Sequence, residues 1–224
     1  MRIPIVVGVT GHRDLREQDI PAIQALVRSE LQKLKDTYPH SPLVMLNSLA
    51  AGADLLCAEV AAEIGISLIS PLPMPTEEYR RDFKDADLVR FDAMLQKATD
   101  SFVSPASEEE PAAMTRDFLY RQAGIYIALH SLVLLALWDG SLAKPGGCGT
   151  AEVVDYMRNR SCAAEYSSFG ATNSNAIIHI LTPRNNADHK PGVSVKLVEN
   201  EPGSLQEVFR LVDAFNAEDE AKRG

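Results

Sequence analysis

The sequence is poor in cysteine and in long apolar runs, and each shortage excludes a class of protein. Its three cysteines, Cys57, Cys148 and Cys162, have no spacing typical of a metal site, which favours a reducing compartment over a disulfide framework. The longest apolar stretch, 125–138, is interrupted by a His-Ser pair and falls short of the ~18 residues of a membrane span. The apolar run at the start is too short for a secretory signal peptide. We therefore expect a cytoplasmic protein, with no membrane contact for this segment.

Positive charge is also scarce. With 22 Lys and Arg against 31 Asp and Glu, the formal net charge is −9, which argues against a broad nucleic-acid or anionic-membrane surface but leaves room for a local basic pocket. Hydrophobic residues make up 46% of the chain and charged residues 24%, so a sizeable core can form and general disorder is excluded. At 224 residues, the chain suits one domain.

Short apolar runs alternate with segments of helical spacing along the chain. Strands are expected at 3–9, 42–49, 66–75, 100–104, 131–137, 176–183 and 193–198. Helices are expected at 19–37, 53–64, 76–98 with a break near Asp85 or Asp87, 114–129, 149–160 and 204–217. A surface loop at 104–113 and a polar insertion at 161–175 complete the pattern. Apolar strands separated by helices predict an α/β fold: a Rossmann-like, doubly wound, mostly parallel sheet with helices on both faces.

In such sheets, ligands bind beyond the carboxyl ends of the strands, so the residues that follow each strand are the first candidates. Three strands run into glycine-containing turns before a helix: "GVTGHRD", "NSLAAGADLL" and "WDGSLAKPGGCGT". Glycine lets a ligand approach the backbone, and a helix N-terminus offers free N–H groups to an anion, most often phosphate. The candidate ligand-binding residues are Thr10, Gly11, His12, Arg13, Ser48, Gly52, Asp139, Gly146, Gly147, Gly149 and Thr150.

Each turn also has a purely structural interpretation. Gly11 suits a tight turn, Asp54 suits a helix N-cap, and Arg13 suits an exposed surface position. His12 suits either a ligand contact or a turn. Three such turns at one sheet edge favour a binding site. The chain has no His, Cys, Asp and Glu spacing typical of zinc, no Gly-Lys-Ser/Thr loop and no G-x-G-x-x-G, so we predict neither a metal nor a cofactor.

At 145–150, "PGGCGT" resembles the P-G-G-x-G-T loop of the "lonely guy" (LOG) phosphoribohydrolases, which cleave the N-glycosidic bond of cytokinin nucleoside monophosphates. The fuller pattern, "GVTGHR … SLAAGADLLCAEVA … LPMP … EY … DF … LLALWDG … GGCGTAEVV", is similar to the wider SLOG superfamily of Rossmann-like domains, which includes relatives of DprA. This resemblance implies a nucleotide-binding domain at 1–182, with 183–224 as a C-terminal extension packed on or trailing it. It also implies a phosphate held by Gly146, Gly147, Gly149 and Thr150, in a crevice lined by Thr10, Gly11, Ser48 and Gly52.

The hydrolase chemistry of that family transfers less well. Its loop continues G-T-x-x-E, whereas "GTAEV" places Glu152 one residue early and Val153 at the glutamate position, a rotation of about 100° on a helix. The family's M-H-x-R-K motif is missing from 114–129, which offers Arg116 and Arg121. We therefore expect a sensor or regulatory domain of a bacterial signalling or defence protein, with a nucleotide or nucleotide-derived molecule as its partner.

Two alternatives stay open. One is a nucleoside 5′-monophosphate phosphoribohydrolase with Arg121 and Glu152 as catalytic residues. The other is a protein-interaction module with a vestigial pocket, and homo-oligomer formation is compatible with each function. Whether the protein is an enzyme is left undecided by the sequence, and no nucleic-acid partner is expected.

Overall fold

The computed structural model describes residues 2–106, 115–142, 149–159, 176–185, 192–199 and 204–223. Within these ranges seven strands form one sheet in the order β4-β3-β2-β1-β5-β6-β7. The strands are β1 (Ile5–Gly11), β2 (Leu43–Leu46), β3 (Ser67–Leu72), β4 (Asp100–Val103), β5 (Val133–Trp138), β6 (Ala176–Leu181) and β7 (Ser194–Glu199). Neighbours from β4 to β6 are parallel, and β7 is antiparallel to β6.

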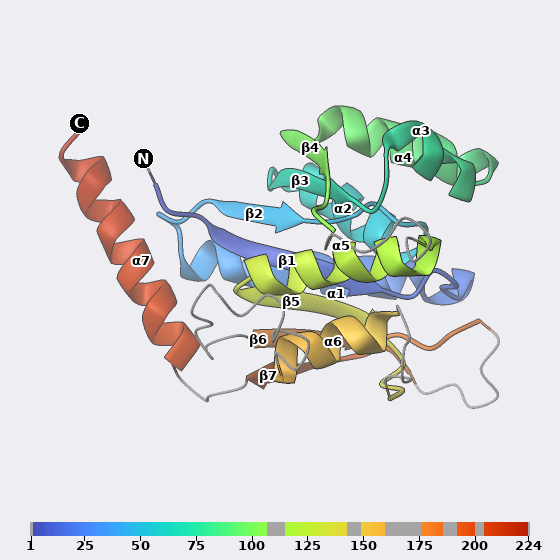
Figure 1. Ribbon diagram of the computed structural model, residues 1–224. Helices are drawn as coiled ribbons and strands as arrows, with labels where there is room; N and C mark the ends of the chain where they lie inside the picture. Colours follow the sequence, from blue (N-terminus) through green and yellow to red (C-terminus); the bar gives the residue numbers. More distant parts are fainter. Residues whose placement is uncertain are drawn as a thin grey trace.

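Helices cover both faces of this sheet. They are α1 (Ile20–Thr37), α2 (Ala53–Glu63), α3 (Thr76–Tyr79), α4 (Asp85–Lys97), α5 (Arg116–His130), α6 (Thr150–Asn159) and α7 (Ser204–Ala221), with short 3-10 turns η1 (Glu17–Asp19) and η2 (Arg80–Asp82). Figure 1 shows α5 and α6 in front of the sheet and α1 and α2 behind it. The predicted α/β, Rossmann-like architecture is confirmed.

Some predicted boundaries need correction. The predicted helix 76–98 is divided into α3, η2 and α4, and α4 begins at Asp85, one of the two positions where a break was predicted. The predicted strand 131–137 starts at Val133, since Ser131 is still bonded to the end of α5 through its hydroxyl, which donates to the carbonyl of Ile127 at 2.6 Å. The predicted insertion 161–175 and most of the predicted loop 104–113 lie outside the described residues.

The apolar character of β5 follows from its central position. Val133, Leu135 and Leu137 belong to the core cluster that also contains residues of α1 and α2, whereas Leu134 and Trp138 belong to the cluster that contains residues of α5 and α6. Successive side chains of a strand point to opposite faces, so a strand covered on both faces is apolar throughout. This burial fixes the carboxyl ends of β1 and β5 beside each other at the centre of the sheet.

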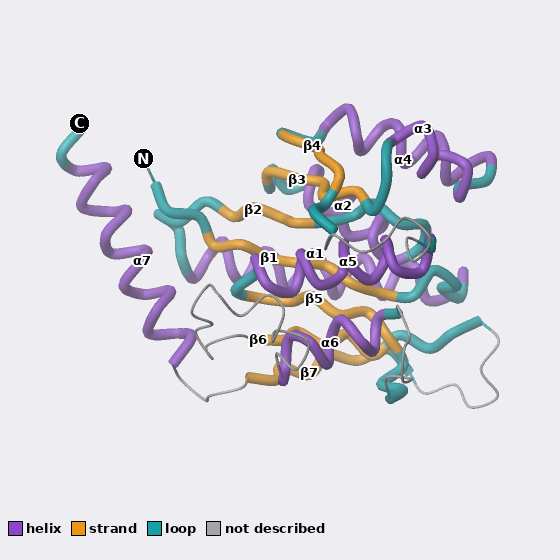
Figure 2. The backbone as a smooth tube through the Cα atoms, viewed as in Figure 1, coloured by secondary structure: helices purple, strands orange, loops and turns teal. Residues whose placement is uncertain are grey.

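The last helix packs against the beginning of the chain. The side chain of Asn216, which is fully buried, accepts a hydrogen bond from the N–H of Ile3 at 2.8 Å and donates one to its carbonyl oxygen at 2.9 Å. Phe209 meets the ring of Tyr38 edge to face, with centroids 5.2 Å apart. Figure 2 shows the same placement, with α7 beside the N-terminus. Residues 204–221 are therefore attached to the same domain.

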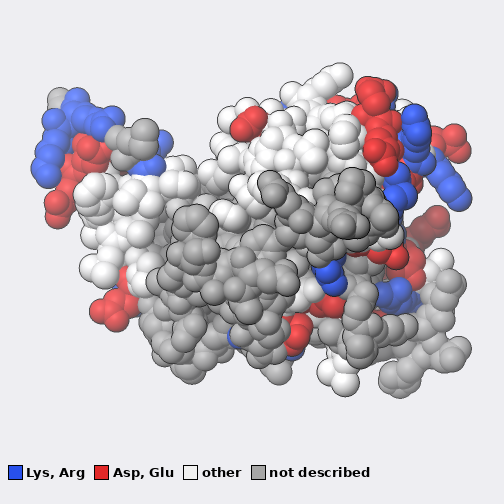
Figure 3. Space-filling model, in the orientation of Figure 1, with Lys and Arg blue, Asp and Glu red and all other residues white. Residues whose placement is uncertain are grey.

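The surface carries both signs of charge. On the face in Figure 3, acidic and basic side chains gather together over α3 and α4 and near the C-terminal end of α7. Some of them form ion pairs, such as Arg80 with Asp92 at 2.8 Å and Arg90 with Glu59 at 2.7 Å. Among the described residues, none of the helices has the length and apolar character needed to cross a membrane.

Candidate functional site

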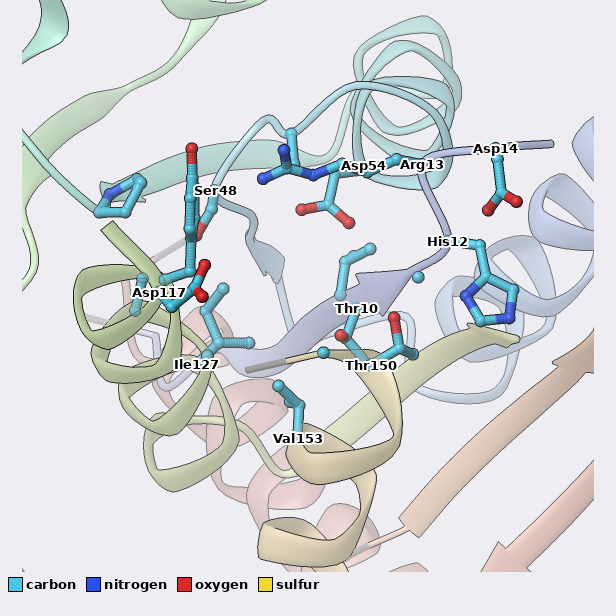
Figure 4. Close-up of a pocket in the computed structure, with 18 of the residues that line it drawn as sticks. Thr10, His12, Arg13, Asp14, Ser48, Asp54, Asp117, Ile127, Thr150 and Val153 are labelled. Carbon is cyan, nitrogen blue, oxygen red and sulfur yellow. The ribbon is translucent and has the colours of Figure 1, made fainter. Parts of the chain in front are cut away.

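A cavity of about 350 Å³ lies at the carboxyl ends of the central strands, within the size range of small-molecule sites. From β1 the chain adds β2, β3 and β4 on one side, and then returns to place β5 on the other. This reversal is the point where open α/β sheets bind ligands. Seven of the predicted ligand-binding residues line the cavity: Thr10, Gly11, His12, Arg13, Ser48, Gly149 and Thr150 (Figure 4).

Two other predicted residues, Gly52 and Asp139, do not line the cavity but hold the backbone of adjacent loops. Gly52 does not line the cavity, and its φ of +85° is a conformation that favours glycine. A Cβ atom at Gly52 would come within 2.5 Å of the carbonyl oxygen of Arg13 and 2.6 Å of that of His12. Gly52 therefore allows the start of α2 to contact the loop after β1. Gly146 and Gly147 lie outside the described residues.

His12 forms hydrogen bonds with β5, with the start of α2 and with the turn after β5. Its N–H donates to the carbonyl of Leu137 at 2.9 Å, and its own carbonyl accepts from the N–H of Ala53 at 3.0 Å. Its ring nitrogen Nε2 accepts from the N–H of Asp139 at 3.1 Å, so that nitrogen carries no proton. Burial and then the charge of Arg184 lower the pKa of His12, despite the nearby Asp139 carboxylate. The ring is therefore neutral, and its 3.3 Å approach to the Asp139 carboxylate is not an ion pair.

Asp139, the other predicted residue outside the cavity wall, holds the turn after β5. Its carboxylate accepts from the N–H of Ser141 at 3.0 Å. Burial raises the pKa of Asp139, but the hydrogen bonds from Ser141 oppose it, and the pKa lies below its ordinary value. Asp139 thus positions His12 instead of facing the cavity.

Asp54 corrects an interpretation made from the sequence. It is not the N-cap of α2: Gly52 holds that position, and no side chain caps the helix. Instead Asp54 lines the cavity with only 7% of its surface exposed. Burial raises the pKa of Asp54 to about 7, against the opposing effects of the Arg13 charge and the backbone of Ala50. The cavity therefore holds a carboxyl group that changes its charge near neutral pH.

The loop between β2 and α2 is fixed by a buried amide. Asn47 accepts a hydrogen bond from the N–H of Leu49 at 2.7 Å and donates to the carbonyl of Asp54 at 2.8 Å. Leu49 adopts a φ of +58°, a conformation that is unfavourable for a side chain of its kind. Between them, Ser48 donates its proton to the carbonyl of Pro71 at 2.8 Å. Asn47 was not singled out in the sequence because nothing in its context reveals this bonding.

A further part of the cavity wall consists of residues from α3 and α5. The Arg13 guanidinium lies over the ring of Tyr120, 4.7 Å from its centroid, and Asp117 stands at the rim. Tyr79 also lines the cavity; it is 1% exposed, and its hydroxyl has no hydrogen-bond partner among the described residues. Tyr79 belongs to the quoted "EY" segment, but the sequence gives it no role.

The first turn of α6 separates two neighbouring side chains. Val153 lines the cavity, whereas the Glu152 carboxylate turns back to accept the N–H of Gly149 at 2.9 Å. This bond is the glutamate half of a capping box, which stabilises the start of a helix. Arg121 does not line the cavity either; its guanidinium lies 5.8 Å from the centroid of the Phe118 ring. Neither predicted catalytic residue therefore lines the cavity, and the catalytic assignment, made for the case of an enzyme, stays a prediction.

The described residues contain no group of three or more His, Cys, Asp and Glu arranged to hold a metal ion. Two arginines and two carboxylates, of which Asp117 is exposed and Asp14 half-buried, surround the mouth of the cavity: Arg13, Arg184, Asp14 and Asp117. Arg184 lies 3.8 Å from the Asp14 carboxylate and 3.5 Å from that of Asp139. The site can therefore present cationic groups and hydrogen-bond acceptors to the same small molecule.

No family model matches the sequence, and no curated protein matches it significantly. Among solved structures, DNA processing protein A (DprA) from Streptococcus pneumoniae aligns with 16% identity and a TM-score of 0.39, over 60% of this chain and 41% of that one. The molybdenum cofactor carrier protein of Chlamydomonas reinhardtii aligns in two structures. One has 18% identity, a TM-score of 0.38 and coverage of 70% of each chain. The other has 15% identity, a TM-score of 0.40 and coverage of 81% and 78%.

The match to DprA spans less than half of that protein's chain. Likenesses of this size carry no information about a ligand. The assignment of the fold rests on the sheet order and helix placement of the chain itself.

Proposed function

We propose that the cavity binds a nucleotide or nucleotide-derived molecule and that the protein acts as a sensor or regulatory domain. The observation that carries this proposal is that polar residues from separate parts of the chain meet in one cavity. Polar residues from three strand-to-helix connections, separated in the sequence, line one cavity, and Thr10, Ser48, Asp54 and Thr150 are each less than 10% exposed. Burial of polar groups is unfavourable unless they have hydrogen-bond partners. A ligand that supplies such partners would therefore explain why these polar residues lie in the cavity wall.

The phosphate is assigned to the start of α6. The partial positive charge of a helix N-terminus favours an anion, and the hydroxyl-bearing residues Thr10 and Thr150 line the cavity there (Figure 4). Because Glu152 already takes the N–H of Gly149, the phosphate would bind the hydroxyls and the next N–H groups of the first turn. Arg13 and Arg184 at the mouth would attract the anion despite the net charge of −9.

The resemblance to the SLOG superfamily supports the same ligand class. The phosphoribohydrolase alternative is weakened, because its two catalytic candidates, Arg121 and Glu152, are not on the cavity wall. The interaction-module alternative gives no reason for a cavity lined by buried polar residues. A binding domain accounts for both observations.

Isothermal titration calorimetry with AMP, GMP, CMP, UMP, ADP-ribose and inorganic phosphate tests the proposal. Thr150→Val removes one hydroxyl while keeping the side-chain shape, and we expect it to weaken the tightest of these ligands about tenfold or more. Thr37→Val, at the end of α1 and outside the cavity, is the matched control and should leave affinity unchanged. Absence of binding by all six probes would refute the proposed function.

A further inference from the structure

Two neighbouring residues of the cavity wall, Ser48 and Asp54, offer hydrogen-bond acceptors to a ligand, beside the Arg13 guanidinium. Ser48 has a single hydroxyl proton, which it donates to the carbonyl of Pro71 at 2.8 Å, so its remaining capacity toward a ligand is that of an acceptor. Beside it the Asp54 carboxyl group points into the cavity, as Figure 4 shows. Both residues line the cavity and are less than 10% exposed. The complementary ligand group is a hydrogen-bond donor.

We infer that Asp54 and Ser48 form a subsite for the sugar hydroxyls of the ligand, which selects a ribonucleotide over its deoxyribonucleotide. This inference rests on the proposed function and deepens it. A ribose carries two adjacent hydroxyls, and each can donate a hydrogen bond to one of two neighbouring acceptors. Removal of either hydroxyl would leave a buried acceptor unpaired, which is the strongest basis that binding sites have for rejecting an analogue.

The placement of the subsite agrees with the order of the groups in a nucleotide. In Figure 4, Thr10 lies between Asp54 and Thr150, so that the carboxyl group and the phosphate position face the same cavity from either side of the end of β1. The hydroxyls of a nucleoside 5′-phosphate are closer to its phosphate than the donor groups of the base are. The sugar is therefore the part of the molecule that reaches Asp54 when the phosphate is at α6.

The charge state of Asp54 is compatible with an anionic ligand. Because burial raises its pKa to about 7, the carboxyl group is only partly ionised at neutral pH and repels a phosphate less than an ordinary aspartate would. Arg13 is the charged group that opposes this shift. Two further titratable groups lie near Asp54: burial and then the charge of Asp54 raise the pKa of Tyr79 and of Cys57. A hydroxyl that donates to Asp54 would favour its ionised form.

The test compares each of AMP, GMP, CMP and UMP with its 2′-deoxy and 3′-deoxy counterpart by calorimetry, using the full chain. We expect the tightest ribonucleotide to bind about tenfold or more tightly than at least one of its deoxy forms. In Asp54→Ala this ratio should fall to near one. Asp117→Ala is the matched control, because it removes a carboxylate from the cavity rim: it should change both affinities equally and keep the ratio.

Asp54→Asn gives a second measurement if Asp54→Ala fails to fold, since it keeps the shape and one acceptor oxygen but loses the charge. Its ratio should be lower than that of the wild type and above one. Equal binding of ribonucleotide and deoxyribonucleotide by the wild-type chain would overturn the subsite and leave the proposed function intact. Loss of the ratio in Asp117→Ala but not in Asp54→Ala would also overturn it. Absence of binding by all the nucleotides would refute the proposed function itself.

Discussion

We expect the stability of Asp54→Asn, measured relative to the wild type, to be greater at alkaline pH than at acid pH. Asp54 is 7% exposed, and burial raises its pKa from 3.8 to about 7. One pKa unit corresponds to 1.36 kcal/mol of difference between the two protonation states. The shift therefore corresponds to about 4 kcal/mol of stability that depends on pH.

The direction follows from proton binding. Between pH 3.8 and about 7 the folded state holds the Asp54 proton and the unfolded state has released it, so the folded state loses stability as the pH rises. The contribution of Asp54 is complete below pH 3.8 and is lost above pH 7. His12 acts in the opposite direction, because its pKa is lowered and the folded state loses stability as the pH falls. The difference between wild type and variant cancels His12 and isolates Asp54.

Urea denaturation of both proteins at about pH 5 and about pH 8.5 measures this difference. Between pH 5 and pH 7 the wild type loses about 3 kcal/mol of the stability that the protonated Asp54 contributes. The stability of Asp54→Asn relative to the wild type should therefore increase by about that amount from pH 5 to pH 8.5. The groups around Asp54 that also respond to pH, Tyr79 and Cys57, have raised pKa values and stay protonated over this range. An equal stability difference at the two pH values would refute the assignment of a buried, neutral carboxyl group.

Three further substitutions test other parts of the site. Tyr79→Phe removes a buried hydroxyl without a partner among the described residues, so the free energy of unfolding in urea should change by less than about 0.5 kcal/mol; a loss above ~1 kcal/mol would reveal a hydrogen bond. Glu152→Ala removes the bond to Gly149 and should lower the thermal stability by about 1 kcal/mol with unchanged nucleotide affinity, and a large loss of affinity in calorimetry would return Glu152 to the site. Gly52→Ala forces a side chain into a φ of +85° and against the carbonyl of Arg13, so it should destabilise the fold by more than ~1 kcal/mol, and an unchanged melting temperature would contradict this packing.

The fold was predictable because its features are repeated along the chain. Apolar runs alternate with helical segments, and β5 is apolar throughout because both of its faces are covered. The position of the cavity was predictable for the same reason, since parallel strands bring their carboxyl ends to one edge of the sheet. The orientation of Glu152 away from the cavity followed from the helical rotation between it and Val153.

The chemistry of the cavity was not predictable to the same degree. Asp54 has the sequence context of an N-cap, and its raised pKa arises only when the folded chain buries it, against the opposing charge of Arg13. Tyr79 belongs to the predicted helix 76–98, with its break near Asp85 or Asp87, and the structure places it at the end of α3, where it lines the cavity. Such environments are produced by residues distant in the sequence, which local patterns do not encode.

The position of β1 in the middle of the sheet has a consequence for the order of folding. Its partner on one side, β2, is made soon after it, but its partner on the other side, β5, begins only at Val133. During synthesis β1 therefore forms the edge of a growing sheet, with unpaired N–H and C=O groups that attract other chains. The strand that carries Thr10 into the cavity is protected on both sides only after most of the chain has left the ribosome.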